Sequence, residues 1–399
     1  MLSSKKSIAM LSSIVLGALS FNSSANANLE LKPIDTTATD AQQNIKSIDF
    51  TQLKRATALH IAQQYQQLKP LLAREINANN QSVSLQTLSD LNQSKLSLDL
   101  GEFNQFKNAV ISAKGYPSDT ANLVELRLAD QSMLSALEQG MTPLFAFEPA
   151  GDESQWQYVE AFDSQGNTHL LDVDVMPQRP VLVVDINAKS DLKAGLKQMK
   201  AVFASFANDS KSVATKDTQS AQTTTSVAAL ETSVLKKISL NDDEEPWISG
   251  KAEVYGIVTG VDSSREAPLL DVVDMPYLDH KDTNYYPNQV VIFWDRYRWS
   301  AADMILMEHD DNTNYQELAV ALANTAGSIM AAIPDPTVQG LAVLGKITAA
   351  LIQAMPSGWF SNDDDYLDVF YTIMKNSTYT NHYGASGNAK INLQPLTIN

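Results

Sequence analysis

The chain has 399 residues, of which 44% are hydrophobic, so it can bury cores for more than one domain. Its formal net charge of −17 argues against nucleic acid or an anionic membrane surface as a partner, and favours cations or cationic molecules. The absence of cysteine excludes disulfides, thiolate metal sites and cysteine nucleophiles. Nothing in the composition identifies a reaction.

The first 27 residues have the pattern of a secretory signal peptide. Lys5 and Lys6 precede an apolar run over residues 8–21, and Ala25 and Ala27 form an A-x-A cleavage site. The apolar run is shorter than the roughly 20 residues that a membrane-spanning helix needs. We therefore predict cleavage after Ala27, a secreted or periplasmic mature protein, and no stable membrane span within it.

Residues 28–207 predict an α+β domain. A helix is expected from about Asp49, with Pro70 expected to break or kink it, and another helix is expected from Asp191 to near Phe206. The strands expected between them cover residues 123–128, 144–147, 157–162, 169–175 and 181–186. The last of these is apolar on both faces, as in a central strand. This order of elements favours a mainly antiparallel sheet.

Residues 208–226 are rich in Ser, Thr, Gln, Asp and Lys, and predict a flexible linker between two domains. The net charge also differs between the two parts of the chain. Residues 1–240 carry 21 basic and 24 acidic residues, whereas residues 241–399 carry 8 basic and 22 acidic residues. The acidity is therefore a property of the C-terminal domain, which we place at residues 227–399.

The C-terminal domain is predicted to be an antiparallel β-sandwich with a helical insertion. The strands expected in it cover residues 252–259, 269–273, 290–294, 304–308, 367–374 and 389–393. Residues 316–355 form two Ala- and Gly-rich apolar helices on either side of Pro334-Asp335-Pro336. Their polar residues and marginal length favour a hairpin packed on the sandwich over one that inserts into a membrane.

Two acidic clusters flank this insertion, at residues 308–314 and 361–368. Calcium takes six to eight oxygen ligands, which Asp and Asn side chains of loops supply. An EF-hand is excluded, because Tyr315 and Ala321 stand where a loop beginning at Asp310 needs a glycine and a glutamate. We therefore predict calcium at the sandwich end, although solvated turns are also rich in Asp and Asn. The expected ligands are Glu308, Asp310, Asp311, Asn314, Asp363 and Asp365, with Asp262 as a further contributor.

Other chemistries have weaker support in the sequence. His280, His309 and His382 lie near carboxylates and leave zinc, iron or manganese open as alternatives to calcium. The sequence contains no H-E-x-x-H motif, no G-x-S-x-G elbow, no P-loop and no dinucleotide-binding fingerprint. These observations favour a protein that is not an enzyme, without deciding the question.

Several segments resemble the secreted bacterial proteins grouped as the domain of unknown function 3103 family. The segments that carry the resemblance are Asn241–Gly250, Ala252–Tyr255, Asp271–Leu278, Tyr286–Gln289, Phe293–Trp299, Glu308–Tyr315 and Pro180–Asp185. The resemblance covers most of the predicted mature chain and implies that both predicted domains belong to one secreted unit. It implies no activity. A looser similarity, to C2-like calcium-binding sandwiches, rests on the acidic segment after residues 304–307.

The sequence as a whole favours a secreted, calcium-stabilised binding or accessory protein with an extracellular ligand or protein partner of unknown identity. The alternative is a secreted metal-dependent hydrolase that acts on a peptide, glycan or phosphoester. A third hypothesis is that the linker at residues 208–226 is cut and the helical hairpin is released.

Overall fold

Six strands form a sheet in the N-terminal half of the chain, in the order β1-β2-β6-β3-β4-β5. They are β1 (Ser82–Ser84), β2 (Val124–Leu128), β3 (Leu144–Ala146), β4 (Tyr158–Phe162), β5 (Thr168–Asp172) and β6 (Val181–Ile186). All neighbours are antiparallel except β3 and β6. The predicted α+β class with a mainly antiparallel sheet is therefore confirmed, and β6 is buried at every position, as its two apolar faces predicted.

The computed structural model describes residues 48–84, 86–90, 98–151, 153–214, 229–241, 246–250, 253–263, 267–309, 311–333, 340–355 and 366–399. The predicted signal peptide lies outside these residues. All of them belong to one compact unit, which covers Gln43–Asn399.

Helices α1 (Thr51–Gln63), α2 (Tyr65–Glu75), α4 (Gly101–Lys114) and α5 (Leu134–Glu138) accompany this sheet and share its hydrophobic core. The prediction that Pro70 breaks the first helix is wrong. The break falls at Gln64, and α2 continues through Pro70. Pro70 lies in the second turn of α2, where its ring removes a single backbone hydrogen bond and the helix continues past it.

Two four-stranded sheets form the C-terminal half, in the orders β10-β7-β14-β13 and β12-β11-β8-β9. Their strands are β7 (Leu230–Leu240), β8 (Val254–Val261), β9 (Pro268–Asp274), β10 (Gln289–Phe293), β11 (Ala301–Glu308), β12 (Tyr366–Met374), β13 (Tyr379–Tyr383) and β14 (Ala389–Ile398). Every pair within them is antiparallel, as predicted. Side chains of both sheets meet in one core, for example Ile238 and Ile391 with Val258 and Met304.

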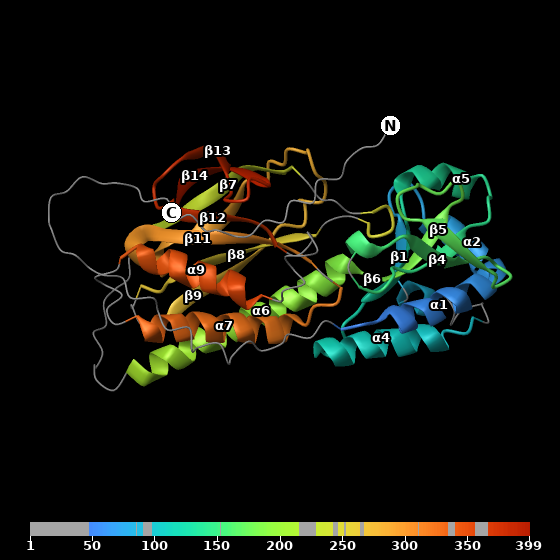
Figure 1. The fold of residues 1–399 in the computed structure, drawn as a ribbon, viewed down its shortest axis with the longest axis horizontal. Coiled ribbons are helices and arrows are strands. Elements are labelled where there is room, and N and C mark those ends of the chain that lie inside the picture. Colours follow the sequence, from blue (N-terminus) through green and yellow to red (C-terminus); the bar gives the residue numbers. More distant parts are fainter. Residues whose placement is uncertain are drawn as a thin grey trace. The chain divides into compact units, whose positions relative to one another are not determined.

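Three helices cover the other face of the β12-β11-β8-β9 sheet (Figure 1). They are α6 (Ala188–Ala214), α7 (Tyr315–Ala332) and α9 (Ala342–Ala354). Close approach of α6 and α7 requires glycine, because a Cβ at Gly195 would lie 2.3 Å from the Tyr315 ring and one at Gly327 would lie 2.9 Å from Phe206. The predicted insertion is thus a pair of helices packed on a sheet. Among the described residues, no helix has the length and hydrophobicity needed to cross a bilayer.

The helical layer explains why the strand expected at residues 252–259 has no face exposed to water. All eight residues of β8 are buried, since Tyr255 and Ile257 face the helices while Val254 and Val258 face the opposite sheet. The sheet is covered on both sides, so both sets of side chains are withdrawn from water.

Helix α6 connects the two halves. It starts directly after β6, and its buried residues Leu192, Leu196, Met199 and Phe203 pack with α7, α9 and the C-terminal sheet. The first seven residues of the predicted linker 208–226 continue this helix to Ala214, and residues 215–226 lie outside the described residues. The division into two domains at this point stays a prediction.

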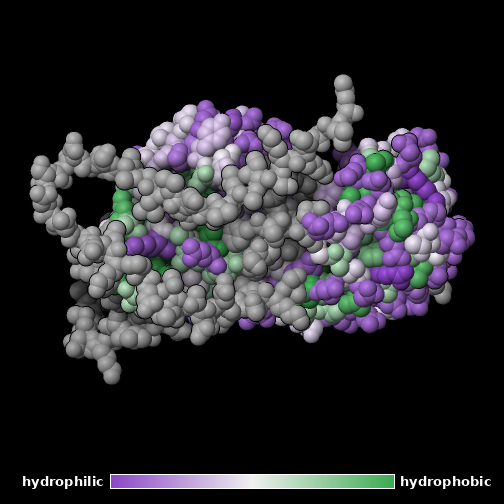
Figure 2. Space-filling view, viewed as in Figure 1, coloured by the Kyte–Doolittle hydropathy of each residue, from purple (hydrophilic) through white to green (hydrophobic). Residues whose placement is uncertain are grey.

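The surface over the first sheet and its helices is mostly hydrophilic in the view of Figure 2, with hydrophobic residues in small separate groups. Single exposed apolar residues of this kind are ordinary on soluble surfaces. The face shown therefore has no large apolar patch over the first sheet and its helices.

Candidate functional site

A cavity of about 720 Å³ lies where the first sheet meets residues from the C-terminal half. The ends of β2 and β6 and the start of α1 line one side, and Ser249, Gly250, Glu253, His309 and Asp311 line the other. Its volume is in the range of small-molecule sites, about 300–1,000 Å³. We therefore take this cavity and the charged groups around it as the candidate functional site.

The ammonium of Lys54 is the centre of the charged cluster. It donates to Glu148 at 2.6 Å, to Asp185 at 2.8 Å and to Asp311 at 3.0 Å. The Lys54 side chain is only 6% exposed, so the ammonium is held by protein oxygens in place of water. Lys54 comes from α1, Asp185 from β6 and Asp311 from the segment after β11, so this one contact joins the two halves of the chain.

Arg127 completes the cluster. Its guanidinium donates to Asp185 through Nε at 2.8 Å, to Glu148 at 3.2 Å and to the carbonyl of Ile248 at 2.5 Å. The sheet register explains this arrangement, because Arg127 and Glu125 of β2 lie beside Val183 and Asp185 of β6 on one face. Nη1 of Arg127 is buried and has no hydrogen-bond partner among the described residues.

The cluster holds two permanent cations and three carboxyl groups, and this imbalance affects their protonation. Burial, together with the Asp185 charge, raises the pKa of Glu148 to about 7, and burial raises the pKa of Asp311 to about 8. Burial acts in the same direction on Asp185, but the charges of Lys54 and Arg127 outweigh it and hold the pKa of Asp185 below its ordinary value. Near neutral pH the cluster therefore keeps an ionised Asp185 beside carboxyls that retain a proton.

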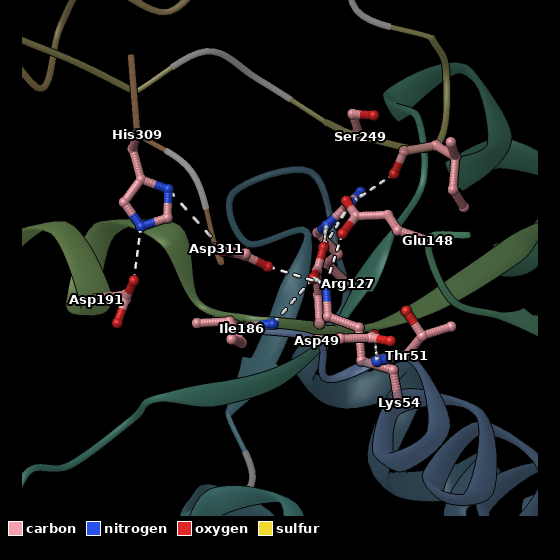
Figure 3. A network of polar contacts seen from close by, with 12 residues as sticks. Asp49, Thr51, Lys54, Arg127, Glu148, Ile186, Asp191, Ser249, His309 and Asp311 are labelled. Carbon is pink, nitrogen blue, oxygen red and sulfur yellow. Dashed lines mark hydrogen bonds and ion pairs between the residues drawn. The ribbon is translucent and has the colours of Figure 1, made fainter. Parts of the chain in front are cut away.

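A second chain of contacts continues from Asp311. Figure 3 shows His309 between the carboxyl groups of Asp191 and Asp311. Its Nε2 lies 2.8 Å from Asp191 and its Nδ1 lies 3.9 Å from Asp311. Burial works against protonation of the imidazole, but the Asp191 carboxylate raises the pKa of His309. Asp191, in the first turn of α6, also accepts from Lys114 at 2.5 Å, and neither of those two side chains is exposed.

Glu253 is the carboxyl of the cavity least committed to other groups. It lies opposite His309, whose backbone N–H donates to the Glu253 carbonyl at 2.8 Å. The Glu253 carboxyl group lines the cavity and makes no hydrogen bond with any described residue. Burial raises its pKa to about 7. Glu253 is therefore an acceptor at the cavity wall that has no hydrogen-bond partner among the described residues.

In the part of the chain that the structure describes, two groups of side chains each bring three possible metal ligands within 4.8 Å of one another: Asp191, His309 and Asp311, and Glu148, Asp185 and Asp311. Each group already binds an ammonium, because Lys114 donates to Asp191 and Lys54 donates to the other three carboxyls. A divalent ion at either place would have to share these oxygens with a lysine, and the two positive charges would repel each other. Both groups are thus better described as carboxylates that bind ammonium.

The predicted calcium ligands are only partly brought together. Asp311 belongs to the Lys54 cluster. The Asn314 oxygen caps α7 by accepting from the N–H groups of Gln316 and Glu317. Glu308 is buried at the end of β11. Asp310, Asp363 and Asp365 lie outside the described residues.

The structure does not bring Asp262 to the other predicted ligands. Asp262 follows β8 at Val261, whereas Glu308 pairs with Val254 at the other end of the same strand. Eight residues of strand separate Asp262 from that end, a distance of about 26 Å at 3.3 Å per residue. One calcium ion cannot bind both Asp262 and Glu308.

The three histidines named as alternative ligands do not lie at one place in the fold. His280 and His309 line the cavity, and His280 is exposed. His382, on β13, packs against Phe370 and Tyr379.

Sequence reasoning found Asp311 but missed Lys54, Arg127, Glu148, Asp185 and Asp191 as site residues. Two of these carried a signal that could have been used. Asp185 is a charged residue within the apolar strand 181–186, and Arg127 is a charged residue within the apolar strand 123–128. A charge in a buried strand needs a partner of opposite charge, so each of these residues predicts that a partner exists. The sequence does not say which residue the partner is.

The comparison with protein families agrees with the resemblance noted in the sequence. A family model described as "Protein of unknown function (DUF3103)" matches residues 54–399. The chain belongs to this family. No curated protein and no solved structure matches the chain. Family membership carries no activity, so the function has to be argued from the cavity.

Proposed function

We propose that this DUF3103 protein is a secreted binding protein and that its ligand occupies the cavity between the first sheet and the C-terminal half. One observation carries this proposal: the cavity of about 720 Å³ is lined by a rigid set of charged groups contributed by both halves. Side chains fixed by ion pairs lose little freedom when a ligand binds, which favours binding.

A thermal-shift screen of polar metabolites tests the binding role. A ligand of the cavity should raise the melting temperature of the wild type, because it binds only the folded state. Ala78 is exposed and lines the cavity, so Ala78→Trp should obstruct it and abolish the shift. Ala331→Trp, at an exposed position of α7 away from the cavity, is the matched control and should keep the shift. If no ligand distinguishes the two variants, the proposal fails.

An enzymatic role is the second candidate, favoured by the pair Glu148 and Asp185. Burial and the neighbouring charges push their pKa values apart, with Glu148 raised to about 7 and Asp185 lowered. Carboxyl pairs of this kind serve as acid and base in hydrolases. Turnover in a panel of peptide, glycan and phosphoester substrates, lost in Glu148→Gln and retained in Glu138→Gln, would replace the binding role by a hydrolase. Glu138 is exposed on α5 and does not line the cavity.

Calcium at a C2-like sandwich end, and secretion itself, remain part of the proposal. With Asp311 and Asn314 engaged elsewhere, the calcium ligands reduce to Glu308, Asp310, Asp363 and Asp365. An ion that binds only the folded protein adds about 2.7 kcal/mol of stability at a hundredfold excess over its Kd. Calcium should therefore raise the melting temperature of the wild type and of Asp282→Asn, an exposed control, but not of Asp363→Asn/Asp365→Asn. An unchanged melting temperature with calcium and with chelator would remove the ion.

A further inference from the structure

We propose that the ligand of the cavity is an aliphatic amine that carries at least two ammonium groups. This inference rests on the binding role proposed above and names its ligand class. The shared chemistry is two or more primary ammonium groups on flexible apolar chains, as in a free diamine or polyamine or in a peptide with two lysine side chains.

The charge of the cavity wall is the first argument. Among the described residues, the cavity is lined by eight Asp or Glu residues, by the three Lys or Arg residues Lys54, Arg127 and Lys189, and by His280 and His309. Lys54 and Arg127 are paired with Glu148, Asp185 and Asp311 in the buried cluster, which leaves five acidic residues and Lys189 on the rest of the wall. The remaining acidic groups therefore dominate the potential in the cavity, which attracts cations and repels anions.

The second argument is that this cavity already shows how it binds an ammonium. The Lys54 group is surrounded by three carboxyl oxygens at 2.6 to 3.0 Å and is withdrawn from water. An ammonium has three N–H donors, and the cluster offers one oxygen to each of them. The same wall presents further carboxyls, of which Glu253 has no hydrogen bond to any described residue.

The third argument is size. A single metal ion reaches ligands at only about 2–2.6 Å and cannot use carboxyl groups spread around a cavity of about 720 Å³. A chain with two or more ammonium groups can reach several of these carboxyl groups at once. The half-buried indole of Trp156 also lines the cavity, and an ammonium group can lie against its face. Spaced positive charges on an apolar chain thus match the wall better than a lone ion.

Titration calorimetry of the full chain in excess chelator tests the inference without any contribution from metals. Putrescine and spermidine are the probes, 1,4-butanediol is the uncharged control, and glutamate is the anion that Nη1 of Arg127 could attract. Glu253→Gln should weaken amine binding about tenfold, the usual effect of losing one charge-assisted hydrogen bond, and Glu138→Gln should leave it unchanged. A dilysine peptide with both ends blocked distinguishes a peptide source from a free polyamine, and N-acetyl-lysine amide, which has a single ammonium, tests the need for a second one.

Binding of the amines over the diol, weakened by Glu253→Gln alone, supports the inference. Equal binding of diol and amines, a preference for glutamate, or equal affinities in the two Glu→Gln variants would overturn it. The binding role would survive such a result if the thermal-shift screen finds another ligand that Ala78→Trp excludes. Circular dichroism of Glu253→Gln checks that the variant is folded, and competition of spermidine with a bound fluorescent diamine in the wild type gives a measure that needs no variant.

Discussion

Two buried sites in this protein stabilise their carboxyl groups in different ways. At the cavity, Asp185, Glu148 and Asp311 surround Lys54 and Arg127. Under α9, Asp303 of β11 is equally buried but has neutral partners only, the Thr348 hydroxyl at 2.7 Å and the backbone N–H of Thr372 at 2.7 Å. The Asp303 cluster joins a helix to a sheet, whereas the charged cluster borders a cavity. Under the proposed binding role, the ionic groups lie where a ligand can contact them.

Replacement of Lys54 by methionine should lower the free energy of unfolding more than any other change at the two sites. It leaves three buried carboxyls with Arg127 as the one permanent cation still in contact with the cluster, and breaking a buried ion pair in this way costs about 3–5 kcal/mol. Urea unfolding at pH 7.5 measures the loss. Addition of Asp311→Asn removes one of the unpaired carboxyls and should recover part of it. A Lys54→Met protein as stable as the wild type would show that the cluster contributes nothing to the fold.

The pH dependence of stability should come from the charged cluster. The pKa values of Glu148 and Asp311 are raised to about 7 and about 8 in the folded chain, so the fold binds their protons more tightly than the unfolded chain does. Their contribution is complete below the unfolded pKa and is lost as the pH rises through the folded pKa. We expect the free energy of unfolding to fall between about pH 5 and pH 9.

Asp311→Asn sharpens this prediction, because it removes the group with the highest of these pKa values. Its stability curve should be flatter than that of the wild type between about pH 6 and pH 9. The lowered pKa of Asp185 acts in the opposite direction, and its contribution is lost only in acid, below about pH 4. Parallel curves for wild type and Asp311→Asn would contradict the assignment.

The smallest effect on the free energy of unfolding is expected at Asp303, whose partners are neutral. Burial raises the pKa of Asp303, so this carboxyl tends toward its uncharged form. Asparagine keeps one acceptor for the Thr372 N–H and can donate to Thr348, whose hydroxyl can turn to accept. Asp303→Asn should therefore cost about 1 kcal/mol or less in urea unfolding. A loss as large as that of Lys54→Met would mean that Asp303 is ionised and that the two clusters do not differ in kind.

The order of elements could be predicted from the sequence, whereas several single elements could not. Apolar runs such as Val181–Ile186 identify their strands because a strand buried on both faces needs apolar residues throughout. Helix α4, with Phe103, Phe106 and Val110 on its buried side, and strand β7 were missed. The predicted linker starts inside α6, because the polar composition at its C-terminal end resembles that of a loop.

The sequence pointed to Asp311, and to His280 and His309 as alternative ligands, but the other site residues were missed for a physical reason. The acidic run after β11 is visible as a cluster along the chain, and Asp311 was taken from it. Lys54 and Asp185 are 131 residues apart, and Lys54 and Asp311 are 257 residues apart. Neither spacing follows a helical or strand period, so no local pattern predicts these pairs.

By itself the sequence determined the family, through the resemblance of its segments. It also determined the α+β class, the mainly antiparallel pairing and the packing of an apolar helical insertion, because these three follow from local periodicity and composition. Only the tertiary structure decided which acidic residues line one cavity and that lysines occupy the carboxylate groups. Charges interact through space over a few ångströms, and the fold alone determines which residues come that close.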